Sequence, residues 1–235
     1  MNKKFVSKHT GHVRFFAACL LASLLLTSAD AQQQGAALLT GMAANAQQLR
    51  QYTFKQRTEM YHKGELKNAR VEEVHYSASG ERISIPLDEQ KSQSDAPRRG
   101  PGHRIVAKKM TEKKEEMKDY VDRLMSLTSR YLTSDPTKLQ AALANAEMTT
   151  GGGSSHVRFR MRDYVKTGDT MTMSFDPATK RPTRTEVNTS LDGSPVAIVL
   201  AFDQIHEGPS YPVRTVVKSD EKQLEIRLLT YDYRL

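Results

Sequence analysis

Apolar and polar residues alternate along most of the chain, with the two-residue period of half-buried β-strands. Turn-forming residues separate the alternating segments, among them Asp176-Pro177 and Asp192-Gly193. Short strands joined by short turns are typical of an antiparallel meander, here of about nine strands. The clearest segments are 52–61, 65–77, 81–86, 157–162, 170–175, 196–202, 211–217 and 224–228.

The helical period of 3.6 residues appears in two longer stretches. Residues 32–49 predict a short amphipathic helix, and residues 104–132 predict a long one. The long stretch has one apolar face, formed by Val106, Met110, Met117, Val121, Leu124, Met125, Thr128 and Leu132. Asp119 and Arg123 are spaced for an i,i+4 ion pair on its surface. A third helix is expected to begin at Pro136, because proline is tolerated at the first helical position.

Together these elements predict an α+β fold in a single domain, residues 32–235. A chain of about 200 residues can bury a sizeable core without disulfides or metals. One internal segment, 88–103, has no periodic apolar face and is rich in proline, glycine, serine and charge. We interpret that segment as a flexible loop.

The first 31 residues have the pattern of a secretory signal peptide. A basic start precedes the apolar run 15–26, and Ala29-Asp30-Ala31 fits the small-x-small cleavage pattern. The apolar run has 12 residues, fewer than the roughly 20 that span a bilayer. We therefore expect cleavage after Ala31 and a periplasmic location. A retained membrane anchor is the alternative.

Cleavage would change both the cysteine content and the charge of the protein. The one cysteine, Cys19, lies in the removed segment, so the mature chain would have no disulfide and no cysteine metal site. Removing four Lys/Arg and one Asp from the chain's 35 basic and 27 acidic residues leaves a net charge near +5. This modest charge, without a base-stacking motif, argues against nucleic acid as a partner. An anionic membrane surface remains a candidate partner.

No pattern of catalytic or metal-binding residues is evident. The five histidines after residue 31 lack metal-binding spacing, although His62 and His75 lie in neighbouring predicted strands. No nucleophile elbow of the Gly-x-Ser-x-Gly type occurs. Glu72 and Glu73 are adjacent in a strand and should point to opposite faces. We therefore expect a protein that is not an enzyme, with no catalytic residues, no metal and no cofactor.

Asp176 lies in the sequence Phe-Asp-Pro-Ala-Thr-Lys, and it is either a reactive carboxylate or part of a turn. The phosphorylated aspartate of cation-pumping ATPases requires Asp-Lys-Thr-Gly-Thr, which differs from this sequence. Aspartate followed by proline is typical of a type I turn. We predict a turn between two strands.

The C-terminal half, from residue 174 to 217, resembles the periplasmic outer-membrane lipoprotein carriers and lipoprotein-sorting proteins. The resemblance is carried in order by Asp176, Pro177, Thr179, Pro182, Arg184, Gly193 and Phe202. The segment YTFKQRTEMYHKGELK is similar to the first hairpin of that family. The resemblance implies a curved antiparallel half-barrel with helices over its concave face. It also implies a cavity for acyl chains between the helices and the sheet.

Methionine-bearing faces are the candidate binding surface, because methionine is flexible and is over-used on promiscuous apolar surfaces. The predicted ligand-binding residues are Met117, Leu124, Met125, Met161, Met171, Met173 and Phe175. The expected function is non-catalytic binding of an acyl chain, another lipid or a lipidated protein. The alternative is an envelope interaction protein with a packed core, whose basic surface binds a partner or a membrane.

Overall fold

The structure is a computed structural model that describes residues 37–91, 103–132, 136–150 and 156–235. The predicted signal segment 1–31 therefore lies outside the described residues, as do residues 92–102 of the predicted loop.

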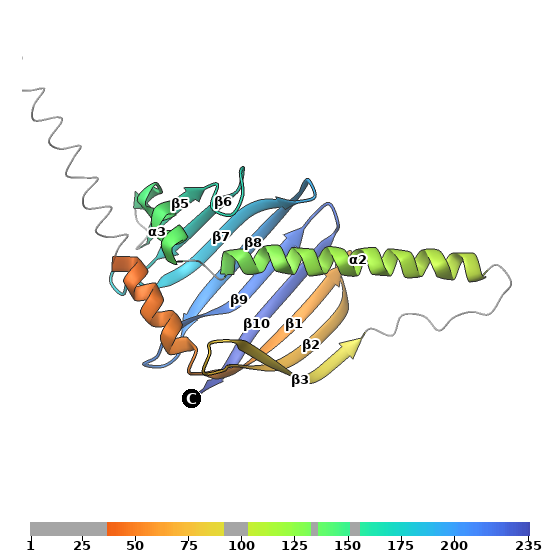
Figure 1. The fold of residues 1–235 in the computed structure, drawn as a ribbon, viewed down its shortest axis with the longest axis horizontal. Helices are drawn as coiled ribbons and strands as arrows, with labels where there is room; N and C mark the ends of the chain where they lie inside the picture. The colour runs from red at the N-terminus through yellow and green to blue at the C-terminus, as the bar shows by residue number, and fades with distance from the viewer. Residues whose placement is uncertain (1–36, 92–102, 133–135, 151–155) are drawn as a thin grey trace, which may run out of the picture.

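A single open sheet of ten antiparallel strands forms the body of the protein, and the sheet is curved (Figure 1). Its strand order is β3-β2-β1-β10-β9-β8-β7-β6-β5-β4, so apart from the contact of β1 with β10 every pair is consecutive in the chain. The strands are β1 (Thr53–His62), β2 (Glu65–Tyr76), β3 (Arg82–Lys91), β4 (Glu147–Thr150), β5 (Val157–Arg162), β6 (Thr170–Phe175), β7 (Pro182–Leu191), β8 (Ser194–Gln204), β9 (Ser210–Ser219) and β10 (Leu224–Arg234). The predicted α+β class and antiparallel meander are confirmed.

The predicted count of about nine strands was wrong by one. The sequence pattern missed β4, which has four exposed residues and therefore no alternation of buried and exposed positions. The predicted loop 88–103 was also too long. Its first four residues belong to β3, which reaches Lys91, and its last residue, His103, begins a helix.

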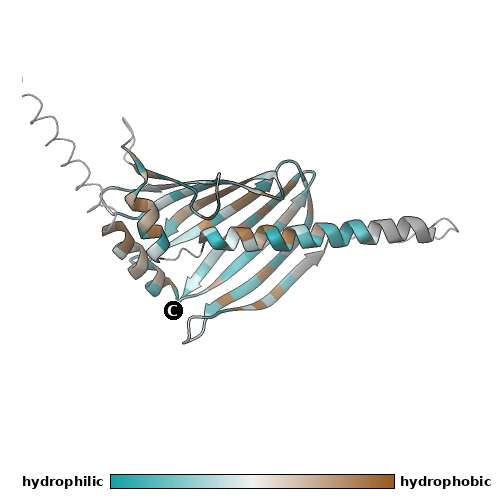
Figure 2. Ribbon diagram, turned by 45° about the horizontal axis from the view of Figure 1, so that its top comes forward, coloured by the Kyte–Doolittle hydropathy of each residue, from teal (hydrophilic) through white to brown (hydrophobic). Residues whose placement is uncertain are grey.

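Hydrophobic and hydrophilic residues alternate along many of the strands, as the coloured bands of Figure 2 show. Because successive side chains point to opposite faces, the two faces of the sheet differ in chemistry. We call the face that carries Phe159, Met173, Ile198 and Val217 the core face, because these side chains are buried in one apolar cluster. Cross-strand pairing of Phe159 with Met173, and of Ile198 with Val217, holds them in register. The opposite face is called the outer face.

The described residues include three helices beside the sheet: residues 37–49, α2 (His103–Leu132) and α3 (Pro136–Ala144). The predicted long helix 104–132 is thus confirmed, as is the start of the third helix at Pro136. Of the described helices, none is both long and apolar enough to cross a membrane.

Helix α2 crosses the sheet and extends past it at its N-terminal end (Figure 1). Its C-terminal half contributes Tyr120, Leu124, Leu127 and Tyr131 to the apolar cluster of the core face. In residues 111–119, by contrast, every side chain is exposed except the half-buried Met117. Of the α2 side chains that the structure describes, the fully buried ones all lie from Tyr120 onward.

The helix of residues 37–49 and helix α3 complete the core. Leu38 from the first, and Leu139 and Leu143 from α3, are buried in the same cluster. Asn45 fixes the first helix to the start of β9 by a reciprocal pair of hydrogen bonds. Its amide donates to the Ser210 carbonyl at 2.8 Å, and its oxygen accepts from the Ser210 backbone N–H at 2.6 Å.

Candidate functional site

The predicted ligand-binding residues of the sheet lie side by side on the core face. Met161 of β5 pairs directly with Met171 of β6, and Met173 and Phe175 follow on the same strand. All four side chains are at most 3% exposed. They form a sulfur-rich apolar floor, and the Phe175 ring meets Phe159 edge-on at 5.9 Å between centroids.

The predicted residues of α2 are divided between the core and its margin. Leu124 is fully buried in the same cluster as the sheet residues, and the half-buried Met125 packs against that cluster. Met117 lies in the otherwise exposed segment 111–119 and is not part of the cluster. The structure thus brings six of the seven predicted residues together.

The buried stripe of α2 is rotated relative to the predicted face. Leu132, predicted to face the core, is 40% exposed, whereas Tyr120, Leu127 and Tyr131 are buried. Spacings of three and four residues link Tyr120, Leu124, Leu127 and Tyr131, so the stripe was visible in the sequence. The predicted face omitted Tyr120 and Tyr131, whose hydroxyls have polar partners in Ser219 and Asp169.

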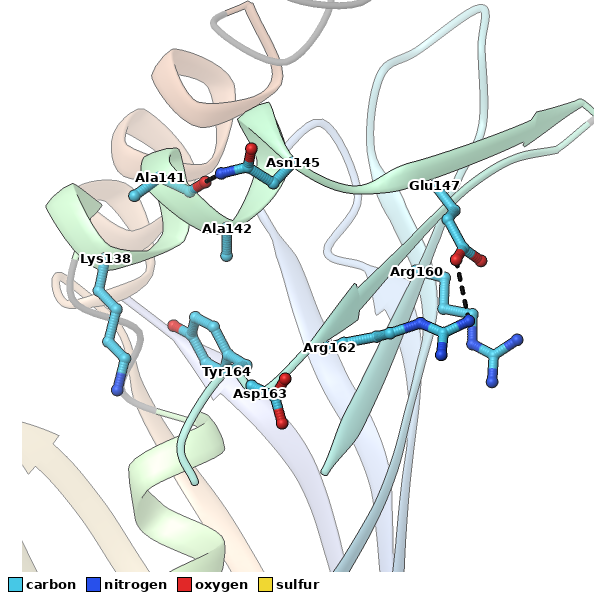
Figure 3. A pocket seen from close by; sticks show the side chains of 9 residues that line it. All are labelled: Lys138, Ala141, Ala142, Asn145, Glu147, Arg160, Arg162, Asp163 and Tyr164. Atoms are coloured by element: carbon cyan, nitrogen blue, oxygen red, sulfur yellow. Dashed lines mark hydrogen bonds and ion pairs between the residues drawn. The ribbon is translucent and has the colours of Figure 1, made fainter. Parts of the chain in front are cut away.

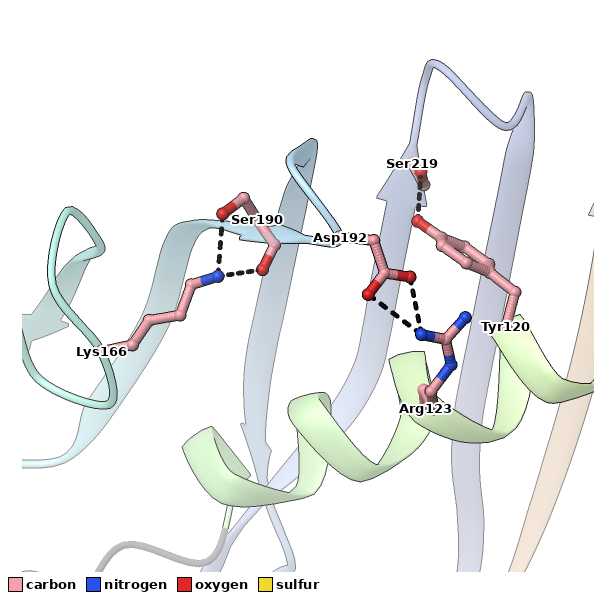
Figure 4. Close-up of polar contacts among 6 residues, drawn as sticks. All are labelled: Tyr120, Arg123, Lys166, Ser190, Asp192 and Ser219. Atoms are coloured by element: carbon pink, nitrogen blue, oxygen red, sulfur yellow. Dashed lines mark hydrogen bonds and ion pairs between the residues drawn. The ribbon is translucent and has the colours of Figure 1, made fainter.

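Two polar contacts hold the middle of α2 to the sheet (Figure 4). The hydroxyls of Tyr120 and Ser219 are 2.8 Å apart at the end of β9. Arg123 contacts both carboxylate oxygens of Asp192, at 3.0 and 2.8 Å. The predicted Asp119–Arg123 pair was therefore wrong, because the arginine reaches across to the sheet instead.

Turn geometry places Asp192 within reach of α2. Asp192 and Gly193 form the two-residue turn between β7 and β8, with φ values of 52° and 83°. Two positive φ angles define the type I′ turn that suits the twist of a hairpin. Close by, the Lys166 ammonium donates to the backbone carbonyl of Ser190 and, at 2.8 Å, to its hydroxyl (Figure 4).

A buried carboxylate anchors the C-terminal end of α2. Asp169 accepts a hydrogen bond from the Tyr131 hydroxyl at 2.6 Å. It also accepts backbone N–H groups of Tyr164, Val165 and Lys166, at 2.7 to 2.9 Å. Burial, together with the hydrogen bond to Asp169, raises the pKa of Tyr131. Four donors satisfy this carboxylate, so its arrangement is that of a structural anchor.

A charged hollow of about 350 Å³ lies between α3 and β5 (Figure 3). Lys138 of α3 lies over the Tyr164 ring, 5.4 Å from its centroid. Arg160 and Arg162 reach the hollow from β5, and Arg162 pairs with Glu147 at 2.9 Å. The cationic groups suit a small anion rather than an apolar ligand.

The two histidines of neighbouring strands, His62 and His75, lie too far apart along β2 to form a joint site. His62 pairs with Glu65 beside the β1–β2 turn, whereas His75 pairs with Ile83 at the other end of β2, so the two histidines do not face each other. Within the described ranges, no group of three His, Cys, Asp or Glu side chains could hold a metal ion.

Asp176 forms the predicted turn between β6 and β7. Its carboxylate accepts the Ala178 N–H at 2.8 Å, and its carbonyl accepts the Lys180 N–H at 2.7 Å. The turn therefore closes through five residues, one more than a type I turn. The backbone N–H groups of Ala178 and Thr179 lower the pKa of Asp176.

The fold and this interior define an α+β protein with one open antiparallel sheet and an apolar helix–sheet core. Comparison with protein-family models gave no match, and comparisons with curated proteins and with solved structures gave none either. The resemblance to lipoprotein carriers therefore rests on the sequence motifs alone.

Proposed function

We propose that the protein is a non-catalytic periplasmic carrier for an apolar ligand, such as an acyl chain or the lipid of a lipidated protein. The ligand would lie between the core face of the sheet and α2. In this proposal α2 and its neighbouring helices cover the concave face of the sheet, and α2 moves outward to admit the ligand.

The uneven seating of α2 carries this proposal. Tyr120 to Tyr131 bind the helix to the sheet, whereas residues 111–119 are exposed apart from the half-buried Met117. A helix held at one half can pivot while the sheet keeps its backbone hydrogen bonds. The apolar cluster that receives α2 also contains Met161, Met171 and Met173, whose unbranched side chains adapt to irregular apolar shapes.

The contacts that would have to open are few. Arg123 and Asp192 have half-exposed side chains, at 56% and 49%, and an exposed ion pair contributes at most about 1 kcal/mol. The Tyr120–Ser219 hydrogen bond is buried and contributes roughly 0.5–1.5 kcal/mol. Opening the helix would also expose its apolar stripe, and a bound acyl chain would cover that stripe again.

The second candidate is an envelope interaction protein with a packed core. It is favoured by the burial of Leu124 and of the four sheet residues, because these side chains are almost completely buried in one apolar cluster. Under this second candidate, Leu124 and the four sheet residues stabilise the fold and bind no ligand.

A reversible lock on α2 separates the two candidates. In a Cys19→Ser background, Arg123→Cys and Asp192→Cys are bridged by a short, cleavable cross-linker with two thiol-reactive ends, since the native side chains are already in contact. We expect the unlocked protein to bind a fluorescent fatty acid, the locked protein to bind none, and cleavage to restore binding. Native mass spectrometry of the purified protein should show co-purified lipid.

A matched lock controls for the chemistry. Lys55→Cys with Asp232→Cys, whose native side chains are 2.6 Å apart on neighbouring strands β1 and β10, does not involve α2. That lock should leave fatty-acid binding unchanged. Binding by the protein with α2 locked would show that the ligand site is elsewhere. An unlocked protein that binds no fatty acid would place the packed-core candidate first.

A further inference from the structure

The outer face of strands β5 to β9 carries an ordered set of cations. Strand register arranges fifteen of its side chains in three cross-strand rows. The rows are Arg158-Ser174-Arg184-Ala201-Arg214, Arg160-Thr172-Glu186-Val199-Val216 and Arg162-Thr170-Asn188-Ala197-Lys218. Six of these fifteen positions are Arg or Lys and one is Glu. We call this set the cationic grid.

The first row alternates arginine with small neutral residues. Arg158, Arg184 and Arg214 lie on β5, β7 and β9, and Ser174 and Ala201 separate them. Because adjacent strands are about 4.8 Å apart, the arginines recur roughly every 9.5 Å. The short residues between them leave each guanidinium accessible from the solvent.

Part of the positive charge of the grid has no ion-pair partner among the described residues. Arg162, Arg184 and Lys218 pair with Glu147, Glu186 and Glu225, respectively. The other three cations, Arg158, Arg160 and Arg214, are exposed, and no ion pair links them to any residue that the structure describes.

The three unpaired arginines leave a repulsive like-charge surface that an external anion would stabilise. Guanidinium groups bind phosphate through two parallel N–H···O bonds, so phosphate groups are the matching chemistry. Among the described helices, α3 reaches the grid at its β5 edge, where Arg160 and Arg162 also line the hollow beside that helix. Arg158, Arg160 and Arg214 remain exposed to solvent.

We infer that the cationic grid docks the protein on an anionic phospholipid surface, with Arg158, Arg160 and Arg214 binding lipid phosphates. The outer face continues across β10, β1, β2 and β3 through a row that contains Tyr231, Lys55, Glu73 and Ile85. Tyr231 and Ile85 are 41% and 47% exposed. Aromatic and aliphatic side chains beside cations are typical of proteins that bind the membrane interface.

A lipid surface fits these residues better than a nucleic acid does. The fifteen positions of the grid contain no aromatic side chain on which a base could stack. The docking face is also opposite the core face, so this inference holds whether the interior carries a ligand or is a packed core.

Vesicle co-sedimentation tests the inference. The purified protein is mixed with vesicles of phosphatidylcholine alone, or of phosphatidylcholine with phosphatidylglycerol. We expect binding only to the vesicles with phosphatidylglycerol, and weaker binding as salt screens the charges. The triple variant Arg158→Gln, Arg160→Gln, Arg214→Gln should bind on the order of a hundredfold more weakly, from the usual contribution of each cation near an anionic surface.

Two matched variants complete the design. Lys113→Gln, Lys114→Gln, Lys118→Gln removes the same charge from exposed positions of α2 and should bind the vesicles like the wild type. Arg158→Lys, Arg160→Lys, Arg214→Lys should retain most of the binding. All variants are prepared in the same form, so that residues 1–31 contribute equally, and their melting temperatures establish that they are folded.

Three outcomes would overturn the inference. If the α2 lysine variant loses as much binding as the arginine-to-glutamine variant, the vesicles respond to the net charge of the protein and not to the cationic grid. Equal binding to both kinds of vesicle would exclude phosphate recognition. Tighter binding to a DNA oligonucleotide than to the vesicles at the same salt concentration, lost in the arginine-to-glutamine variant, would assign the grid to nucleic acid.

Discussion

The Tyr131 hydroxyl donates a 2.6 Å hydrogen bond to the buried carboxylate of Asp169. This bond joins the last turn of α2 to the loop between β5 and β6, across 38 residues of sequence. The same hydroxyl lies 2.9 Å from the Thr189 hydroxyl on β7. One tyrosine therefore fixes the C-terminal end of α2 to two separate parts of the sheet.

Tyr131→Phe should destabilise the protein by about 1–3 kcal/mol, because Asp169 would lose a donor inside the protein. The free energy of unfolding in urea measures the effect. Tyr231→Phe is the control, since Tyr231 is an exposed side chain on the outer face, and it should change stability by less than about 0.5 kcal/mol. Equal stability of Tyr131→Phe and the wild type would show that the hydroxyl is not an anchor.

Alkaline pH should destabilise the wild type partly through Tyr131. Burial and the hydrogen bond to Asp169 raise the pKa of Tyr131 in the folded protein. Its contribution is therefore complete below the unfolded pKa of about 10 and is lost as the pH rises through the folded value. Melting temperatures measured above pH 10 should fall less steeply for Tyr131→Phe than for the wild type. Tyr233, whose pKa is also raised by burial, accounts for a remaining slope.

Local periodicity predicted most of the fold because it reports burial directly. Strand β6, for example, alternates Met171, Met173 and Phe175 with threonine and serine. This alternation predicts a half-buried strand without any knowledge of the neighbouring strands. Strand β4 was not predicted, because its four side chains are all exposed and show no alternation of buried and exposed positions. It is a strand through its backbone pairing with β5, which the sequence pattern does not reveal.

The polar contacts of α2 were not predictable in the same way. The sequence around Asp169 gives no sign of its hydrogen bond to a tyrosine 38 residues earlier. Arg123 had a suitable partner within its own helix in Asp119, yet it pairs with Asp192, 69 residues away. Which polar partner each of these side chains finds depends on how whole helices and strands are arranged in space.

Leu124→Ala should destabilise the protein by about 2–5 kcal/mol, because the Leu124 side chain of α2 is fully buried and its truncation leaves a cavity. Leu132→Ala is the matched control on the same helix and should change stability by less than about 0.5 kcal/mol. Thermal and urea unfolding measure both. A small effect at Leu124 would mean that α2 is seated more loosely than its burial indicates.

Acid should abolish the difference between the wild type and Asp176→Asn. Backbone N–H groups of Ala178 and Thr179 lower the pKa of Asp176. The charged form therefore stabilises the β6–β7 turn above the unfolded pKa of about 3.9, and this contribution is lost as the pH falls through the folded value. The wild type should melt above the variant at neutral pH and together with it in strong acid. Asp220→Asn, an exposed control, should show no such convergence.

Arg123→Ala tests whether the contact between α2 and the β7–β8 turn controls access to the interior. The pair is half exposed, so the free energy of unfolding should fall by no more than about 1 kcal/mol. If α2 opens to admit an acyl chain, however, the rate of fatty-acid uptake should rise, because opening no longer has to break this pair. High salt should increase uptake by the wild type, by screening the pair, and change the variant less.

Lys55→Ala is the control for that experiment, because it removes an ion pair between β1 and β10 that does not involve α2. It should leave the uptake rate unchanged at both salt concentrations. Faster uptake in both variants would indicate general loosening of the fold rather than release of α2. If the wild type and both variants take up no fatty acid, Arg123 and Asp192 only hold the helix to a packed core. The carrier proposal would then give way to the interaction protein.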